Sequence, residues 1–109
     1  MSRGRGWYPN PRDGDVVEFE IDVEHDSVTV KTVSVNGCGA ASRAASELAR
    51  WAHGKTPEDG ARIEPRELIG RLDLGPDEER CALTAIAALR AALIDAHVTE
   101  LAEHEVGQR

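Results

Sequence analysis

Two successive runs of alternating apolar residues constrain the fold of this chain more than any other feature of its sequence. In the first run, Val17, Phe19, Ile21 and Val23 alternate with acidic residues. This period of two predicts a strand that buries one face. The pair His25-Asp26 follows the run and is predicted to form a turn.

The second run starts with Val28 and Val30 but continues with Val33 and Val35, so its parity changes. The change predicts a β-bulge near residues 31–32 that resets the register. The two runs should therefore form an antiparallel hairpin. Because a two-stranded hairpin is only marginally stable in water, we expect helices to cover it.

Three helices are predicted after the hairpin. Apolar residues recur at helical spacing through residues 40–53, after the flexible Gly37-Cys38-Gly39 segment, and Gly54 is the expected C-cap. A short helix should run from Pro65 to about Leu72, and the longest from about Pro76 to His104. The predicted fold class is α+β: a small antiparallel hairpin or sheet packed against three helices, with a long C-terminal helix.

The first 15 residues, Met1 to Asp15, have a different composition. They contain glycine, arginine, proline and asparagine, with Trp7 and Tyr8 as the anchors. This composition predicts an irregular N-terminal arm. Residues 16–106 should form a single domain, which is the usual number for a chain of 109 residues.

The charge balance limits the partners that this chain can bind. Thirteen Lys and Arg residues stand against twenty Asp and Glu residues, which gives a net charge of −7 and disfavours binding to nucleic acid. The basic start lacks the apolar run of a signal peptide, and we expect no stretch with the ~20 apolar residues of a membrane span. We therefore expect a cytoplasmic protein.

Four side chains could form a metal site. In an antiparallel hairpin, Asp13 and Asp15 lie at the same end as Cys38, and Cys81 joins them if the long helix docks there. The helix that follows Cys38 favours the thiolate form at its N-terminus. Two carboxylates beside two thiolates fit a four-coordinate zinc or iron site. The alternative is that both cysteines are simply buried and both aspartates cap a turn.

A family resemblance favours the metal site. The run Asn36 to Ser42, followed by Glu47 to Thr56, resembles the cysteine loop and the following helix of the NifU-like, IscU-type, iron-sulfur cluster assembly scaffolds. The segments Arg80 to Leu83 and Ala91 to Ala96 resemble the third cysteine segment and the closing helix of that family. The resemblance extends roughly from Arg12 to Ala96.

The resemblance implies a ligand set. Family members hold a transient cluster, or zinc, with three cysteines and an aspartate, and Cys38, Cys81 and Asp15 occupy three of those positions. Asp13 occupies the fourth, where the family has a cysteine. Arg80 stands where one family branch has a histidine ligand. This arginine could pair with an aspartate or steady an anionic cluster.

Gly37 and Gly39 flank the first of the two cysteines in this sequence. With Arg80, they are expected to surround the ligands without binding the metal themselves.

The function that the resemblance implies is a scaffold or carrier, not an enzyme, for iron or a [2Fe-2S] cluster. Its implied partners are a cysteine desulfurase and cluster-accepting proteins. One alternative is a zinc-organised sulfur-transfer protein that accepts persulfide from the desulfurase. Another is a metal-free interaction domain that has lost the site.

The family's N-terminal helix and first strand have no counterpart in the sequence pattern. Their absence would leave a sheet edge exposed, and an exposed edge predicts a homodimer or coverage by another protein.

Overall fold

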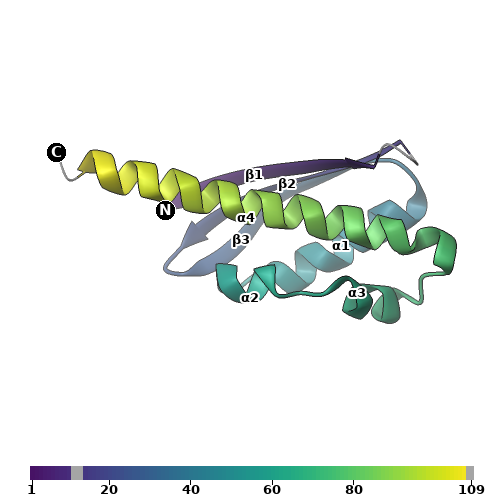
Figure 1. The fold of residues 1–109 in the computed structure, drawn as a ribbon. Coiled ribbons are helices and arrows are strands. Elements are labelled where there is room, and N and C mark those ends of the chain that lie inside the picture. Colours follow the sequence, from purple (N-terminus) through teal and green to yellow (C-terminus); the bar gives the residue numbers. More distant parts are fainter. Residues whose placement is uncertain (11–13, 108–109) are drawn as a thin grey trace.

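The computed structural model describes residues 1–10 and 14–107, which form a three-stranded antiparallel sheet and a set of helices (Figure 1). The α+β class with a long C-terminal helix is confirmed. The strands run in the order β1-β2-β3, with bounds Ser2–Asn10, Asp15–Glu24 and Ser27–Asn36. The helices are α1 (Gly39–Ala52), α2 (Pro57–Ala61), α3 (Pro65–Leu72), the single 3-10 turn η1 (Pro76–Glu78) and α4 (Glu79–Gly107).

The predicted hairpin is formed by β2 and β3. His25 and Asp26 both have positive φ angles and make the turn between the strands. The register passes from the pair Glu20 and Thr32 to the pair Ile21 and Val30, so Lys31 is the extra residue of a bulge. This bulge accounts for the change of parity within β3.

The expectation of an irregular arm over residues 1–15 is wrong for Ser2–Asn10. These residues form β1, which pairs with β2 along its whole length, and the inference that the sheet lacks an edge strand is wrong for the same reason. Strand propensity missed β1 because the segment contains glycine, proline and asparagine, which are weak strand formers.

Glycine suits β1 because the strand lies directly on a helix. A Cβ atom at Gly4 or Gly6 would collide with backbone atoms of α4 around Ala92. The backbone N–H of Arg5 donates to Oδ2 of Asp95 on α4 over 2.8 Å, which ties the outer edge of the strand to the helix.

The core lies between the sheet and the helices. Its largest fully buried side chains come from the strands and from three helices: Val17, Phe19, Ile21, Val28, Leu48, Leu68 and Leu89. α4 faces the sheet with a row of alanines, and such small residues permit close packing.

The helix boundaries follow the predictions with three differences. The C-cap of α1 is His53, and the expected cap Gly54 follows it with a φ of 87°. α3 spans Pro65–Leu72 as predicted. The connector at residues 55–63 contains the short helix α2, in which Thr56 accepts a hydrogen bond from the N–H of Asp59. At the start of the long helix, residues 76–78 form η1 before α4 begins.

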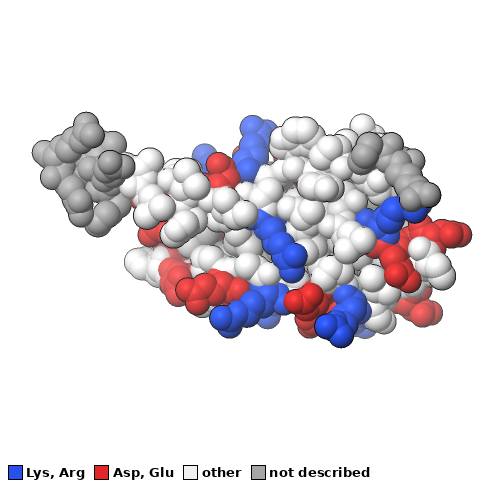
Figure 2. All heavy atoms as spheres, in the orientation of Figure 1, with Lys and Arg blue, Asp and Glu red and all other residues white. Residues whose placement is uncertain are grey.

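The segment Pro76–Glu103 is more apolar than expected. It is long and apolar enough to cross a membrane by length and composition, with a mean hydropathy of 1.5 over the best window. Of that window, 56% is buried within the protein, as in the core helix of a soluble domain, so it is weak evidence for a membrane span. Figure 2 shows a largely uncharged surface where α4 crosses the molecule, with charged side chains gathered below it.

The contact between β1 and α4 can be tested with Gly6→Ala. The added methyl group would meet the α4 backbone, so we expect the variant to lose about 2 kcal/mol of unfolding free energy. Gly70→Ala is the matched control, because its added Cβ would meet no atom within 4 Å and alanine favours the α3 helix. Urea denaturation of both variants measures the difference. Equal midpoints would contradict direct packing of β1 on α4.

Candidate metal centre

Three candidate ligands lie at one end of the sheet, where β2 begins, β3 ends, and α1 and α4 begin (Figure 1). Asp15 is the first residue of β2, and Cys38 is the N-cap of α1 directly after β3. Cys81 lies in the first turn of α4. Because β2 and β3 are antiparallel, the start of one strand adjoins the end of the other, as the sequence predicts.

The ligand atoms of these residues are close together. The sulfur atoms of Cys38 and Cys81 lie 3.7 Å apart. Oδ2 of Asp15 lies 3.6 Å from the sulfur of Cys38 and 3.8 Å from that of Cys81. Within the part of the chain that the structure describes, this is the only such group of His, Cys, Asp and Glu ligands.

These distances fit the ligands of one tetrahedral metal ion. With metal–sulfur bonds of about 2.3 Å and metal–oxygen bonds of about 2.0 to 2.2 Å, tetrahedral angles place two sulfurs about 3.8 Å apart and sulfur and oxygen about 3.6 Å apart. All three separations agree with this geometry to within a few tenths of an ångström. The described residues therefore supply three corners of a tetrahedron.

The three ligands differ in their access to solvent. Asp15 and Cys81 each expose only 3% of their surface, and Cys81 packs against Ala40 and Ala41 of α1. Cys38 is exposed. Asp15 and Cys81 are thus buried by the surrounding strands and helices, and solvent reaches the site at Cys38.

Gly37 allows Asp15 to approach Cys38. A Cβ atom at Gly37 would collide with the Asp15 carboxylate. The same carboxylate accepts a hydrogen bond through Oδ1 from the backbone N–H of Cys38 over 3.1 Å. One oxygen of Asp15 is therefore anchored to the backbone while the other faces the sulfur atoms. The sequence pattern gave no sign of this hydrogen bond.

The remaining predicted site residues have different outcomes. Asp13 lies outside the described residues. A Cβ atom at Gly39 would meet no atom within 4 Å, so no steric contact requires glycine there. Arg80 is partly buried directly before Cys81, and its role toward a cluster stays a prediction.

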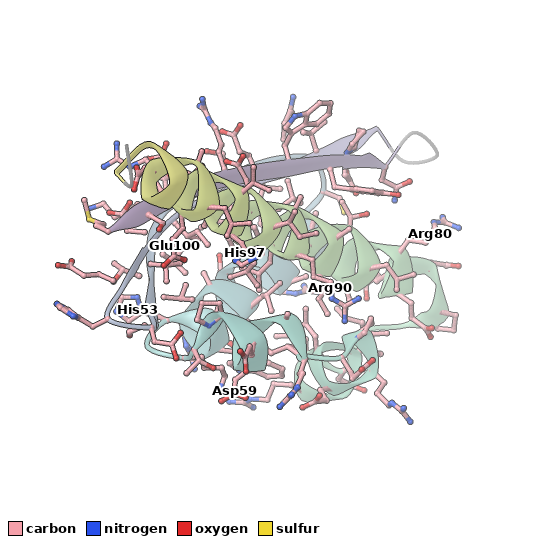
Figure 3. The ribbon with its side chains drawn as sticks, turned by 60° about the vertical axis from the view of Figure 1, so that its left-hand side comes forward. His53, Asp59, Arg80, Arg90, His97 and Glu100 are labelled. Carbon is pink, nitrogen blue, oxygen red and sulfur yellow. The ribbon has the colours of Figure 1, made fainter. Side chains whose placement is uncertain are left out.

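Of the four histidines, only the side chains of His25, His53 and His97 are described, and none joins this group. His53 is the C-cap of α1, one residue before the expected Gly54, and its Nδ1 accepts from the N–H of Val30 over 3.3 Å. Figure 3 shows Arg80 at one end of the molecule, with His53 and Glu100 toward the other. The three described histidines therefore leave the ligand set unchanged.

Known proteins resemble this chain along most of its length. The model of the NifU-like N terminal domain matches residues 1–101. The iron-sulfur cluster assembly scaffold protein IscU of Rickettsia prowazekii is 34% identical over 93 residues, which cover 84% of this chain and 71% of the relative. The iron sulfur cluster assembly protein 1 of Trachipleistophora hominis is 32% identical, over 84% of this chain and 67% of the relative.

The fold also occurs among solved structures. A crystal structure from Fervidobacterium islandicum AW-1, assigned to a SUF-system scaffold for iron-sulfur cluster assembly, superposes with a TM-score of 0.69. The alignment covers 84% of this chain and 81% of that one at 17% identity. At this identity the likeness concerns the fold.

The close approach of Gly37 to Asp15 predicts the effect of Gly37→Ala on metal binding. The added methyl group must displace the carboxylate, and displaced groups of this kind lower metal affinity by about 10- to 100-fold. Titration with cobalt(II), followed by its absorption, measures the affinity. Gly39→Ala adds a methyl group in open space and should bind as the unaltered chain does. Equal affinities of the two variants would contradict the positioning of Asp15 by Gly37.

Proposed function

The chain belongs to the family of the NifU-like N-terminal domain, and on that premise we propose that it is a scaffold or carrier in iron-sulfur cluster assembly. Its cargo is iron or a [2Fe-2S] cluster, bound by Cys38 and Cys81 with Asp15 beside them. The observation that carries this proposal is the close approach of the three ligand atoms at an end of the sheet that opens to solvent.

The ligand set suits a cargo that the protein must release. Thiolates are the soft ligands that iron-sulfur clusters prefer, whereas a carboxylate is a harder and poorer match. A site with two thiolates and one carboxylate therefore holds iron less firmly than three thiolates would. The exposed sulfur of Cys38 gives the cargo a route in and out.

The proposed partners follow from the cargo. A cysteine desulfurase supplies the sulfur, and cluster-accepting proteins receive the product, as the resemblance implies. The protein works as a scaffold without catalysing a reaction alone, and we place it in the cytoplasm. The relatives are named for iron-sulfur cluster assembly, which supports the assignment as a scaffold.

A second candidate is sulfur transfer at a zinc-organised site. The three ligands at three corners of a tetrahedron favour this function, because catalytic zinc sites commonly have three protein ligands and an open fourth position. In this reaction, the Cys38 thiolate attacks the outer sulfur of the desulfurase persulfide. A new S–S bond forms on Cys38, the old S–S bond breaks, and the desulfurase cysteine leaves as a thiolate.

Loading under anaerobic conditions tests the first candidate. The unaltered chain, Cys38→Ser and Cys81→Ser are each supplied with iron and sulfide and then desalted. We expect visible thiolate-to-iron absorption and matched iron and sulfide in the unaltered chain, with both lost in each variant because a hydroxyl is a poor ligand for the cluster. Ser46→Ala, at an exposed position on α1, is the control and should load fully.

Two other outcomes would contradict the scaffold proposal. Zinc alone, with sulfur added to Cys38 by a desulfurase and detected by mass spectrometry, would favour sulfur transfer. No metal under any loading condition would remove both functions. Thermal unfolding of each variant shows whether a loss of loading reflects a loss of fold.

A further inference from the structure

A groove lies far from the three candidate ligands, beside the C-terminal half of α4. It is lined by residues of α4, α2, the end of β2 and the turn that follows, and it has a volume of about 750 Å³. Figure 3 shows three of its α4 residues, Arg90, His97 and Glu100, following one another along the helix. Cys81 and Glu100 lie about 19 residues apart on α4, or about 28 Å along the helix axis. This distal groove is therefore separate from the metal centre.

Apolar side chains from several elements line the distal groove. Leu93 of α4 is buried, whereas its neighbour Ile94 exposes 65% of its surface and Met1 exposes 70%. Val23 at the end of β2 and Pro57 at the start of α2 are half-buried. The buried centre of a protein interface is typically apolar, and covering such side chains is favourable. The distal groove thus presents an apolar surface to a partner.

Four acidic side chains also line the distal groove, and all four are exposed: Glu24, Asp26, Glu58 and Glu100. Among the residues that the structure describes, Asp26, Glu58 and Glu100 form no ion pair. Glu24 contacts the imidazole of His25, with 3.7 Å between Oε1 and Nε2. Most of this negative charge is therefore open to a ligand.

The cations of the distal groove do not cancel this charge. Arg90 directs its guanidinium to the backbone, where Nε donates to the carbonyl of Ala61 over 3.3 Å and Nη2 to that of Ile63 over 3.2 Å. Arg90 and the amino group of Met1 are two cations against four carboxylates, so the lining has an excess of two negative charges when its histidines are neutral. The charge of the groove therefore favours a cationic ligand.

The four carboxylates do not converge on one point. They come from β2, the turn after it, α2 and α4. Within the described part of the chain, only Asp15, Cys38 and Cys81 bring three metal-ligating atoms within 4.8 Å of one another. The distal groove therefore offers no ligand set for a single metal ion. Cationic side chains spaced along a peptide, with an apolar side chain between them, match both its acidic and its apolar residues.

We propose that the distal groove binds a basic segment of another protein. An apolar side chain of that segment packs on Leu93 and Ile94, and its lysine or arginine side chains face Asp26, Glu58 and Glu100. Because the metal centre lies near the other end of α4, the partner can stay bound while Cys38 remains open to solvent. The inference does not depend on the identity of the cargo.

Selection from a library of short random peptides displayed on phage tests the chemistry of the ligand. The bait is the full chain, free of metal. We expect the enriched peptides to combine lysine or arginine with a large apolar residue. No enrichment, or enrichment of peptides without cations, would overturn the proposal. The enriched peptides are then synthesised with a fluorescent label, and their affinities are measured by fluorescence polarisation.

A pair of double variants tests the charge of the distal groove. Asp26→Asn with Glu100→Gln removes two charges and keeps the side-chain shapes, and asparagine tolerates the φ of 60° at position 26. We expect the enriched peptides to bind this double variant about tenfold more weakly. Asp77→Asn with Glu79→Gln is the matched control, because it changes the net charge equally at two exposed acids near the start of α4. Equal weakening in both double variants would overturn binding in the groove.

A second pair tests the apolar contact. Ile94→Ser removes an exposed apolar side chain of the distal groove, and Leu83→Ser removes one near the other end of α4 that exposes 52% of its surface. We expect Ile94→Ser to weaken peptide binding at least fivefold and Leu83→Ser to leave it unchanged. Equal affinities of the two variants would contradict the proposal.

Two further measurements separate docking from folding, cargo binding and self-association. Thermal unfolding and cobalt(II) binding should be the same in Ile94→Ser and Leu83→Ser, so that a loss of peptide binding reflects the groove alone. Sedimentation of the metal-free chain should show a monomer. A dimer that Ile94→Ser alone dissociates would mean that a second copy fills the groove, and this would overturn the proposal.

Discussion

The register between β2 and β3 is the constraint on which the site depends. Val16 pairs with Asn36, so the residues just beyond this pair, Asp15 and Gly37, also face each other across the end of the hairpin. A slip of one residue would turn every side chain of the strand to the opposite face of the sheet. The bulge at Lys31 absorbs the change of parity in β3, and the carboxylate keeps its position opposite the cysteine segment.

The second constraint is the close packing of α4 on the sheet. Gly4 and Gly6 of β1 leave room for the α4 backbone, and the alanine face of the helix completes the fit. Long apolar packing of this kind sets where the helix begins relative to the sheet, and therefore where Cys81 lies. Hence the β1 glycines, which lie about 75 positions before Cys81 in the sequence, help to fix where Cys81 lies through their contact with α4.

Sequence patterns predicted what depends on periodicity and local turn chemistry. The hairpin, its turn at His25-Asp26, the bulge and the helix α3 all follow from rules that act over a few residues. β1 was not predicted, because its glycines are required by contact with α4, which is distant in sequence. The hydrogen bond from the Cys38 backbone to Asp15 was not predicted either, because the two residues are also distant in sequence. The proximity of Asp15, Cys38 and Cys81 was predicted.

The main hydrophobic core beside the ligands contains neither cysteine. Phe19, Leu48 and Leu89 are fully buried between the sheet and the helices, independently of the cysteines. In small zinc domains, by contrast, the free energy of metal binding is the free energy of folding, so release of the metal unfolds the chain. A carrier cannot use that arrangement, because it must survive each release. Here the ligands sit at the ends of elements that pack together through a core without either cysteine, so release of the cargo leaves those core contacts in place.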